Sequence, residues 1–127
     1  MSRSDSPMIH LESTVLGSPD PQAAVRFYAR LLSWEIRNDE RDWCTLRNPG
    51  GGPGLSFQLE DDFVRPVWPE QPGRQQMMMH LDLRVEDLQK AAAHAKECGA
   101  QRADHQPQDD VVVFLDPDGH PFCLFEK

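Results

Sequence analysis

The chain repeats one pattern of secondary structure, and this repeat limits the folds that are open to it. Each half begins with a strand-like segment, continues with one amphipathic helix and ends with several short strands. The two halves align in sequence with an offset of 67 residues. This offset matches Asp20 with Asp87 before the two helices, and Ser13 with His80 in the two opening strands. A module of this length cannot bury its sheet alone, so the repeat predicts an α+β fold of two βαβββ modules.

Both predicted helices carry start and stop signals. Asp20 precedes a proline and an apolar stripe at helical spacing, which predicts a helix over residues 21–32. Asp87 precedes a second stripe that Gly99 ends, which predicts a helix over residues 87–98. The expected strands lie in the segments MIHLESTVL, DWCTLRN, GLSFQLE, MMMHLDLRV, DVVVFLD and PFCLFEK.

The segment between the halves indicates how the chain is organised. We expect a single domain over residues 1–127, with a first module at about 8–60 and a second at about 77–127. Residues 61–76 are rich in proline and charged side chains, and they form the predicted linker.

Composition excludes several classes of partner. The chain has 13 Lys and Arg against 21 Asp and Glu, a net charge of −8, which argues against binding to nucleic acid phosphates. No stretch approaches the roughly 20 apolar residues of a membrane span, and the N-terminus has no apolar signal-peptide core. The three cysteines lack CxxC spacing, which indicates reduced thiols and a cytoplasmic location. The acidic balance favours a neutral or cationic small molecule as the partner.

Three segments resemble the vicinal oxygen chelate superfamily, and within it the glyoxalase-like and bleomycin-resistance-like proteins. They are SPDPQAAVRFYARLLSW, HLDLRVEDLQKAAAHAKECGA and FLDPDGHPFCLFE. The resemblance implies two βαβββ modules whose curled mixed sheets enclose a cavity, and a homodimer that completes it. Because this fold serves lyases, dioxygenases, epimerases and drug-binding proteins, the resemblance does not by itself name a reaction.

Metal-using members of the superfamily place four ligands on four strands. The resemblance assigns these positions here to Ser13, Gln58, His80 and Cys123. His80 is a strong ligand, whereas Gln58 offers a neutral amide oxygen and the Ser13 hydroxyl stays protonated. Cys123 departs from the carboxylate that glyoxalases use to move a proton. We therefore expect no metal and no other cofactor at these positions, with a zinc site of His80 and Cys123 as the alternative.

Strand alternation places His80 on the face opposite the apolar side chains, where it either lines a cavity or meets solvent. Cys123 is interpreted as a small apolar residue in the cavity wall. Met78, Phe114 and Trp43 are further candidates for that wall, with ordinary core packing as the alternative for the aromatic residues.

The leading hypothesis is a glyoxalase-like protein that binds an aromatic or cationic small molecule without a metal. The expected ligand-binding residues are Ser13, Gln58, His80, Cys123, Met78, Phe114 and Trp43. Two alternatives stay open: a glyoxalase-type lyase or isomerase with an unusual set of metal ligands, and a structural domain with a filled cavity. Whether the protein is an enzyme is therefore open at this stage, and a homodimer is expected.

Overall fold

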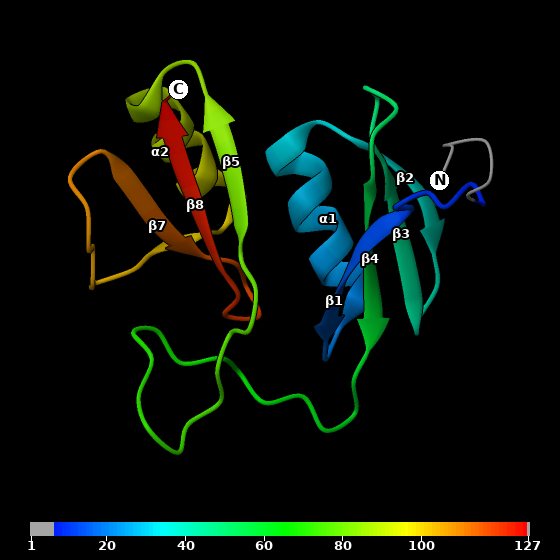
Figure 1. Cartoon of the computed structure of the whole chain (residues 1–127), viewed down its shortest axis with the longest axis horizontal. Coiled ribbons are helices and arrows are strands. Elements are labelled where there is room, and N and C mark those ends of the chain that lie inside the picture. Colours follow the sequence, from blue (N-terminus) through cyan, green and yellow to red (C-terminus); the bar gives the residue numbers. More distant parts are fainter. Residues whose placement is uncertain (1–6, 127) are drawn as a thin grey trace.

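The computed structural model describes residues 7–126 and contains two sheets of four strands, each accompanied by one helix (Figure 1). The elements of the first module are β1 (Ser13–Ser18), α1 (Pro21–Leu32), β2 (Glu35–Asp39), β3 (Trp43–Arg47) and β4 (Gly54–Leu59). Those of the second are β5 (Leu81–Val85), α2 (Leu88–Cys98), β6 (Gln101–Arg102), β7 (Val111–Leu115) and β8 (Pro121–Glu126). The predicted α+β fold of two βαβββ modules is confirmed, and the two sheets stay separate rather than closing into one barrel.

The two sheets share one topology. Their strand orders are β1-β4-β3-β2 and β5-β8-β7-β6. In each sheet the opening strand runs parallel to the last strand, and the other pairs are antiparallel. The first and last strands of a module are therefore neighbours, which sets Ser13 opposite Gly54 and Asp82 opposite Cys123.

The helices begin and end where their capping residues predict. The Asp20 side chain accepts a hydrogen bond from the Ala23 amide at 3.2 Å, and Asp87 accepts one from Lys90 at 3.1 Å. Gly99 ends α2 with a φ of 109°, which glycine adopts without strain. The predicted helix ends agree with the observed ones except at the start of α2, which lies one residue later.

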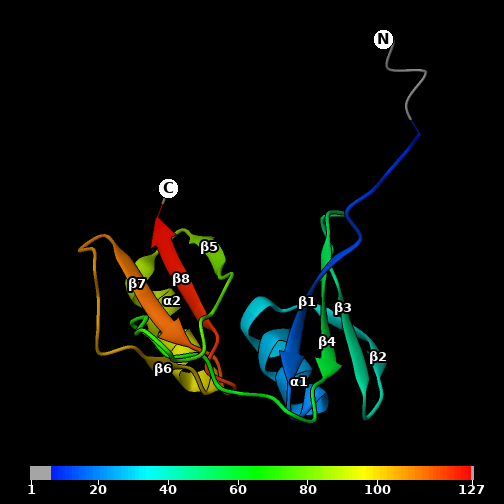
Figure 2. The same ribbon diagram turned by 60° about the horizontal axis from the view of Figure 1, so that its bottom comes forward.

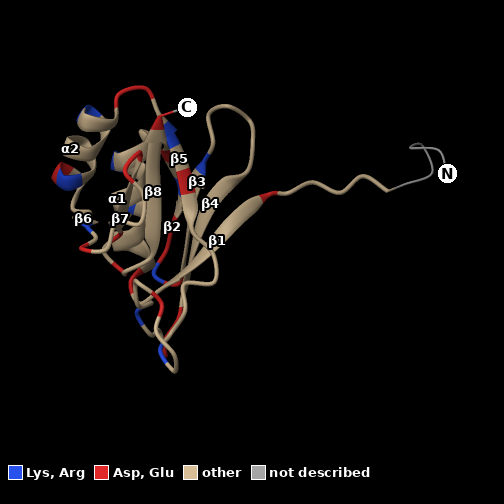
Figure 3. Ribbon diagram, turned by 60° about the vertical axis from the view of Figure 1, so that its left-hand side comes forward, with Lys and Arg blue, Asp and Glu red and all other residues tan. Residues whose placement is uncertain are grey.

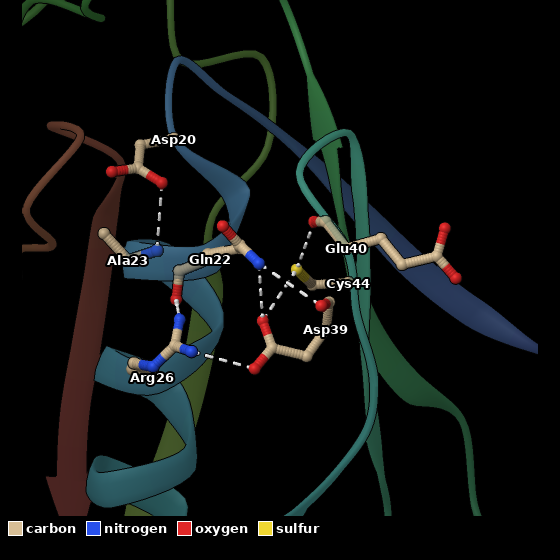
Figure 4. Close-up of polar contacts among 7 residues, drawn as sticks. All are labelled: Asp20, Gln22, Ala23, Arg26, Asp39, Glu40 and Cys44. Atoms are coloured by element: carbon tan, nitrogen blue, oxygen red, sulfur yellow. Dashed lines mark hydrogen bonds and ion pairs between the residues drawn. The ribbon is translucent and has the colours of Figure 1, made fainter.

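Polar contacts fasten α1 to the β2–β3 hairpin (Figure 4). Asp39 accepts from Arg26 Nη2 at 2.8 Å and from Gln22 Nε2 at 3.1 Å. The buried Cys44 thiol donates to the Glu40 carbonyl at 3.1 Å, and burial raises the pKa of this thiol. Cys44 therefore acts as a neutral structural residue.

Strand positions differ from the sequence expectation in two ways. The segments MIHLESTVL and MMMHLDLRV form strand only from Ser13 and Leu81 onward. In the second segment Met78 has a positive φ of 65°, which breaks the extended backbone before β5. Sequence patterns also missed β2, which is mostly polar, and β6, which has two residues.

Aromatic side chains connect the cores of the two modules. Tyr28 on α1 stacks on Phe57 of β4 with ring centroids 5.5 Å apart, and it contacts Phe122 of β8 at 6.2 Å. Phe27 also approaches Phe122, which in turn stacks on Phe114 of β7. Helix α1 consequently lies between its own sheet and the second module (Figure 1).

A buried carboxylate adds a polar connection at the same junction. Asp116, only 2% exposed, accepts from the Tyr28 hydroxyl at 2.7 Å and from His120 Nδ1 at 2.7 Å. It also accepts from the backbone amides of Asp118 and His120, at 2.9 and 2.8 Å. The Gly119 amide donates to the Asp116 carbonyl at 2.9 Å, which closes the turn between β7 and β8.

The chain between β4 and β5 has neither helix nor strand, and it crosses from one module to the other (Figure 2). Basic and acidic residues are interspersed along the ribbon in the view of Figure 3. Within residues 7–126 neither helix is long and apolar enough to cross a membrane. The expected domain includes residues 1–6 and 127, which lie outside the described part of the chain, as does the start of the N-terminal segment expected to lack a signal peptide.

The hydroxyl of Tyr28 is expected to stabilise the junction between the modules. Replacing Tyr28 by Phe removes one donor from a buried carboxylate, so the free energy of unfolding should fall by roughly 1.5–3 kcal/mol. Chemical denaturation measures this change. The control is Thr45→Val, which removes an exposed hydroxyl hydrogen bond to Asn38 and should change the stability by less than about 0.5 kcal/mol. Equal losses in the two variants would contradict a special role for Tyr28.

The protein should lose stability as the pH rises from 6 to 8. Burial alone would lower the pKa of His120, but its hydrogen bond to Asp116 and the charges of Asp116 and Asp118 outweigh burial and raise that pKa above 6.5. The folded state therefore binds more protons than the unfolded state in this range. The stabilisation by His120 is fully present below the unfolded pKa of about 6.5, and it is lost as the pH rises through the raised pKa of the folded state.

The slope should reach at most about 1.4 kcal/mol per pH unit, measured by urea unfolding at several pH values. Burial also raises the pKa of Asp118, so the free energy of unfolding should fall with rising pH in the lower range where Asp118 titrates as well. A His120→Gln variant keeps a hydrogen-bonding side chain without titrating, so its stability should be nearly constant from pH 6 to 8. A wild-type profile as flat as that of the variant would contradict the prediction.

Candidate functional site

A hollow of about 1160 Å³ lies on the sheet of the first module. Residues from all four strands line it, together with the β3–β4 loop and the segment before β1. The lining includes the side chains of Ser13, Arg37, Trp43, Thr45, Arg47 and Ser56.

Strand alternation explains why these side chains are available. On β3, Cys44 and Leu46 are buried in the core that includes α1 residues, whereas Trp43, Thr45 and Arg47 are exposed or half-buried. Successive side chains of a strand point to opposite faces of the sheet. The helix therefore covers one face, and the opposite face supplies the floor of the hollow.

The hollow combines an aromatic ring with charge and hydroxyl groups. Trp43 is 37% exposed there. Two arginines, Arg37 and Arg47, and one carboxylate, Glu12, supply the formal charges of the lining. The Ser13 hydroxyl lies 2.6 Å from the Ser56 hydroxyl. These two hydroxyls place hydrogen-bonding groups on the neighbouring strands β1 and β4.

The seven residues expected to bind a ligand do not lie together in one site. Ser13 and Trp43 line the hollow, and the other five do not. Met78 is 77% exposed and has the left-handed backbone described above. Phe114 is fully buried against Phe122, so it belongs to the core of the second module rather than to an open wall.

Gln58 and Ser13 are engaged within their own module. The Gln58 amide donates to Glu60 Oε2 at 2.7 Å, and the Ser13 hydroxyl is paired with Ser56. An amide and a protonated hydroxyl held in this way are weak ligands for a divalent cation. The four positions taken from metal-using relatives therefore do not fit the metal centre of those enzymes.

His80 and Cys123 instead meet at a third residue, Asp82. The His80 Nε2 atom lies 3.0 Å from Asp82 Oδ1, and Cys123 is opposite Asp82 in the β5–β8 pair. Burial raises the pKa of the Cys123 thiol, and the neighbouring Asp82 carboxylate raises it further. His80 also borders a narrow gap of about 20 Å³ beside Thr14 and Leu16 of β1, with room for about one water molecule.

Sequence reasoning missed Arg37, Arg47 and Asp82. Asp82 follows His80 by two residues, so alternation places it on the same face, but only the strand pairing shows that it also faces Cys123. Arg37 lies at an irregularity in the β2–β3 register between Ile36 and Asn38, which no sequence pattern indicates.

The other cysteine–histidine contact of the described region has a structural role. His94 Nε2 lies 3.2 and 3.1 Å from the carbonyl oxygens of Arg30 and Leu31 at the end of α1, and 3.7 Å from Cys98 Sγ. Cys98 is buried, and burial raises the pKa of its thiol. His94 therefore ties α2 to the C-terminal turn of α1.

The fold and this arrangement define a class of protein. The family model of the glyoxalase-like domain matches residues 13–125, and the chain belongs to that family within the vicinal oxygen chelate superfamily.

Individual relatives agree with this assignment. Over 71 residues the chain is 35% identical to the "Uncharacterized protein YaeR" of Escherichia coli (strain K12), a match covering 51% of this chain and 55% of that protein. The match thus spans about half the length of this curated relative. The glyoxalase family protein from Enterococcus faecalis is 28% identical with a TM-score of 0.64, covering 94% of this chain and 97% of that one.

A further solved structure resembles the chain in fold alone. The "glyoxalase/bleomycin resistance protein/dioxygenase family enzyme" from Burkholderia phytofirmans PsJN has a TM-score of 0.69 at 16% identity. The alignment covers 93% of this chain and 98% of that one.

Proposed function

We propose that this protein binds a small aromatic molecule that carries an acidic or hydrogen-bonding group. The site is the hollow of the first module, and binding there requires no metal at Ser13 or Gln58. The observation that carries the proposal is the combination of Trp43 with Arg37 and Arg47 on one open sheet face.

The size of the hollow supports a small-molecule ligand. Binding sites for such ligands commonly measure about 300–1,000 Å³, and this hollow has about 1160 Å³ and opens to solvent. The partly exposed Trp43 ring offers a flat apolar surface on which an aromatic group can stack. The glycine-rich segment of the β3–β4 loop forms part of the rim, where the backbone can approach a ligand closely.

The local charge selects the polar part of the ligand. The chain as a whole is acidic, but the hollow holds two arginines and a single carboxylate, Glu12. Arginine pairs with carboxylate and phosphate groups through two parallel hydrogen bonds. Of the two ligand types expected from the sequence, the aromatic one is retained, and an anionic group replaces the cationic one.

The proposal includes a homodimer. Leu11 and Val15 border the hollow with 73% and 47% of their surface exposed, beside Trp43. A second copy lying over this face would bury these apolar side chains and enclose the ligand. Such burial is favourable at about 25 cal/mol per Å² of apolar surface.

Substitutions in the hollow should weaken binding of an aromatic anion. With 8-anilinonaphthalene-1-sulfonate as the fluorescent ligand, Trp43→Ala and Arg47→Ala should each raise the Kd about tenfold, or about 1.4 kcal/mol, because one removes stacking and the other a charged donor. Fluorescence titration measures both changes.

The matched controls lie outside the hollow. Trp68, whose indole donates to the His105 carbonyl, is replaced by Ala, and so is the exposed Arg84 of β5. Neither change should raise the Kd by more than twofold. If Trp43→Ala and Trp68→Ala weaken binding equally, or if a cationic dye of similar size binds as tightly, the proposed ligand chemistry is wrong.

The oligomeric state provides a separate test. Light scattering after gel filtration at micromolar concentration should give the mass of a dimer. Val15→Lys should shift the protein toward monomer, because it places a charge within the apolar part of the covered face. The control Val64→Lys changes an exposed valine of the linker and should leave the dimer intact. A wild-type monomer at these concentrations would contradict the homodimer.

A further inference from the structure

Three side chains of different chemistry converge on the second module. Within residues 7–126, His80, Asp82 and Cys123 form the one group of three or more His, Cys, Asp or Glu residues whose ligand atoms all lie close enough to hold a metal ion. These atoms, a ring nitrogen, a carboxylate oxygen and a sulfur, all lie within 4.8 Å of one another.

The backbone accounts for this convergence. Strands β5 and β8 are parallel neighbours, and their register sets Asp82 directly opposite Cys123. His80 precedes Asp82 by two residues, next to the start of β5, and its Nε2 atom lies 3.0 Å from the Asp82 carboxylate. Asp82 and Cys123 therefore lie on two hydrogen-bonded neighbouring strands, and His80 lies one residue before β5.

The spacing suits a tetrahedral cation. Zinc binds nitrogen, oxygen and sulfur ligands at about 2.0–2.3 Å, which separates neighbouring ligand atoms in a tetrahedron by about 3.3–3.8 Å. The observed separations extend from the 3.0 Å contact to at most 4.8 Å, so small side-chain rotations bring the three atoms to this geometry. The side chains of His80 and Asp82 are 38% and 62% exposed, which gives an ion access from solvent.

The types of ligand select the metal. A thiolate with an imidazole and one carboxylate matches the mixed sulfur, nitrogen and oxygen coordination of zinc. Magnesium and calcium prefer oxygen ligands alone, so this group suits them poorly. The Cys123 thiol, whose proton passes to solvent when zinc binds, becomes the anionic sulfur ligand.

We propose that His80, Asp82 and Cys123 bind one Zn²⁺ ion on the open edge of the second module, with the fourth coordination position left to solvent. This inference is independent of the proposed function, because none of the three residues lines the hollow of the first module. It replaces the expectation of no metal, because Asp82 supplies a carboxylate ligand that does not belong to the four positions of metal-using relatives.

Cobalt provides the spectroscopic test, since Co²⁺ occupies zinc sites and its bond to a thiolate absorbs in the near ultraviolet. The full-length chain without an affinity tag is freed of metal with a chelator and then titrated with Co²⁺. The wild type should develop the sulfur-to-cobalt band at one equivalent, together with the intense visible bands of tetrahedral cobalt, and added Zn²⁺ should abolish both.

Variants assign the ligands. Cys123→Ser should eliminate the sulfur-to-cobalt band, and His80→Ala and Asp82→Asn should each raise the Kd for Zn²⁺ at least tenfold in a chromophoric competition assay. The matched controls are His94→Ala and Cys98→Ser, which alter the other cysteine–histidine contact. Both controls should retain the band and bind Zn²⁺ within threefold of the wild type.

Three outcomes would overturn the proposal. They are a wild type without the band, a band that survives Cys123→Ser, and a band that is lost with Cys98→Ser alone. If Cys123→Ser fails to fold, as judged by circular dichroism, Asp82→Asn at an exposed position decides the question, and unchanged Zn²⁺ affinity in that variant refutes the site. Binding of the naphthalenesulfonate should be the same with and without Zn²⁺, so this site and the hollow can fail separately.

Discussion

The relative placement of the two modules depends on one buried carboxylate. Asp116 belongs to the β7–β8 turn of the second module, yet the Tyr28 hydroxyl that contacts it comes from α1 of the first. An ionised carboxylate without partners would be too costly to bury, and this one accepts from two side chains and two backbone amides. A carboxylate with this many directed contacts has little freedom to move. The turn, and with it the start of β8, is therefore held against α1.

Apolar packing and this polar contact reinforce each other. Tyr28 uses its ring to stack on Phe57 and to contact Phe122, while its hydroxyl reaches Asp116. A single side chain thereby contributes to the first core, the second core and the junction. The same requirement explains why this tyrosine is almost completely buried although its hydroxyl is polar, because every polar atom of the contact has a partner.

Local signals in the sequence predicted much of this fold. Asp20, Asp87 and Gly99 determine the helix ends because a capping side chain acts within a few residues of its own position. Strand β6 escaped prediction because two residues carry no periodicity, and the start of β5 was misplaced because the positive φ of Met78 leaves no mark on a pattern of apolar residues. The limit in both cases is that pairing and backbone geometry are determined by distant parts of the chain.

The candidate sites depended even more on long-range structure. Alternation along one strand correctly groups His80 with Asp82, but it does not show which residue of β8 faces them. Phe114 illustrates the opposite error: an aromatic residue on a strand is equally consistent with a cavity wall and with a core, and only its stacking on Phe122 decides between them. Ser13 and Trp43 line the hollow without the other residues expected beside them, and the two arginines in its lining had no signal in the sequence.

The two proposed sites have a consequence for catalysis. A metal-assisted reaction requires the substrate to reach the coordination sphere of the ion, but the zinc ligands and the hollow belong to different modules and share no lining residue within one chain. If both proposals hold, one chain alone would bind its ligand and its metal at separate sites. A lyase or isomerase would need a second copy whose zinc ligands face the hollow of the first. A dimer that covers the hollow with the β5 edge of its partner would bring Trp43, the two arginines and the three proposed zinc ligands into one enclosed site. A dimer formed through any other face would keep them apart.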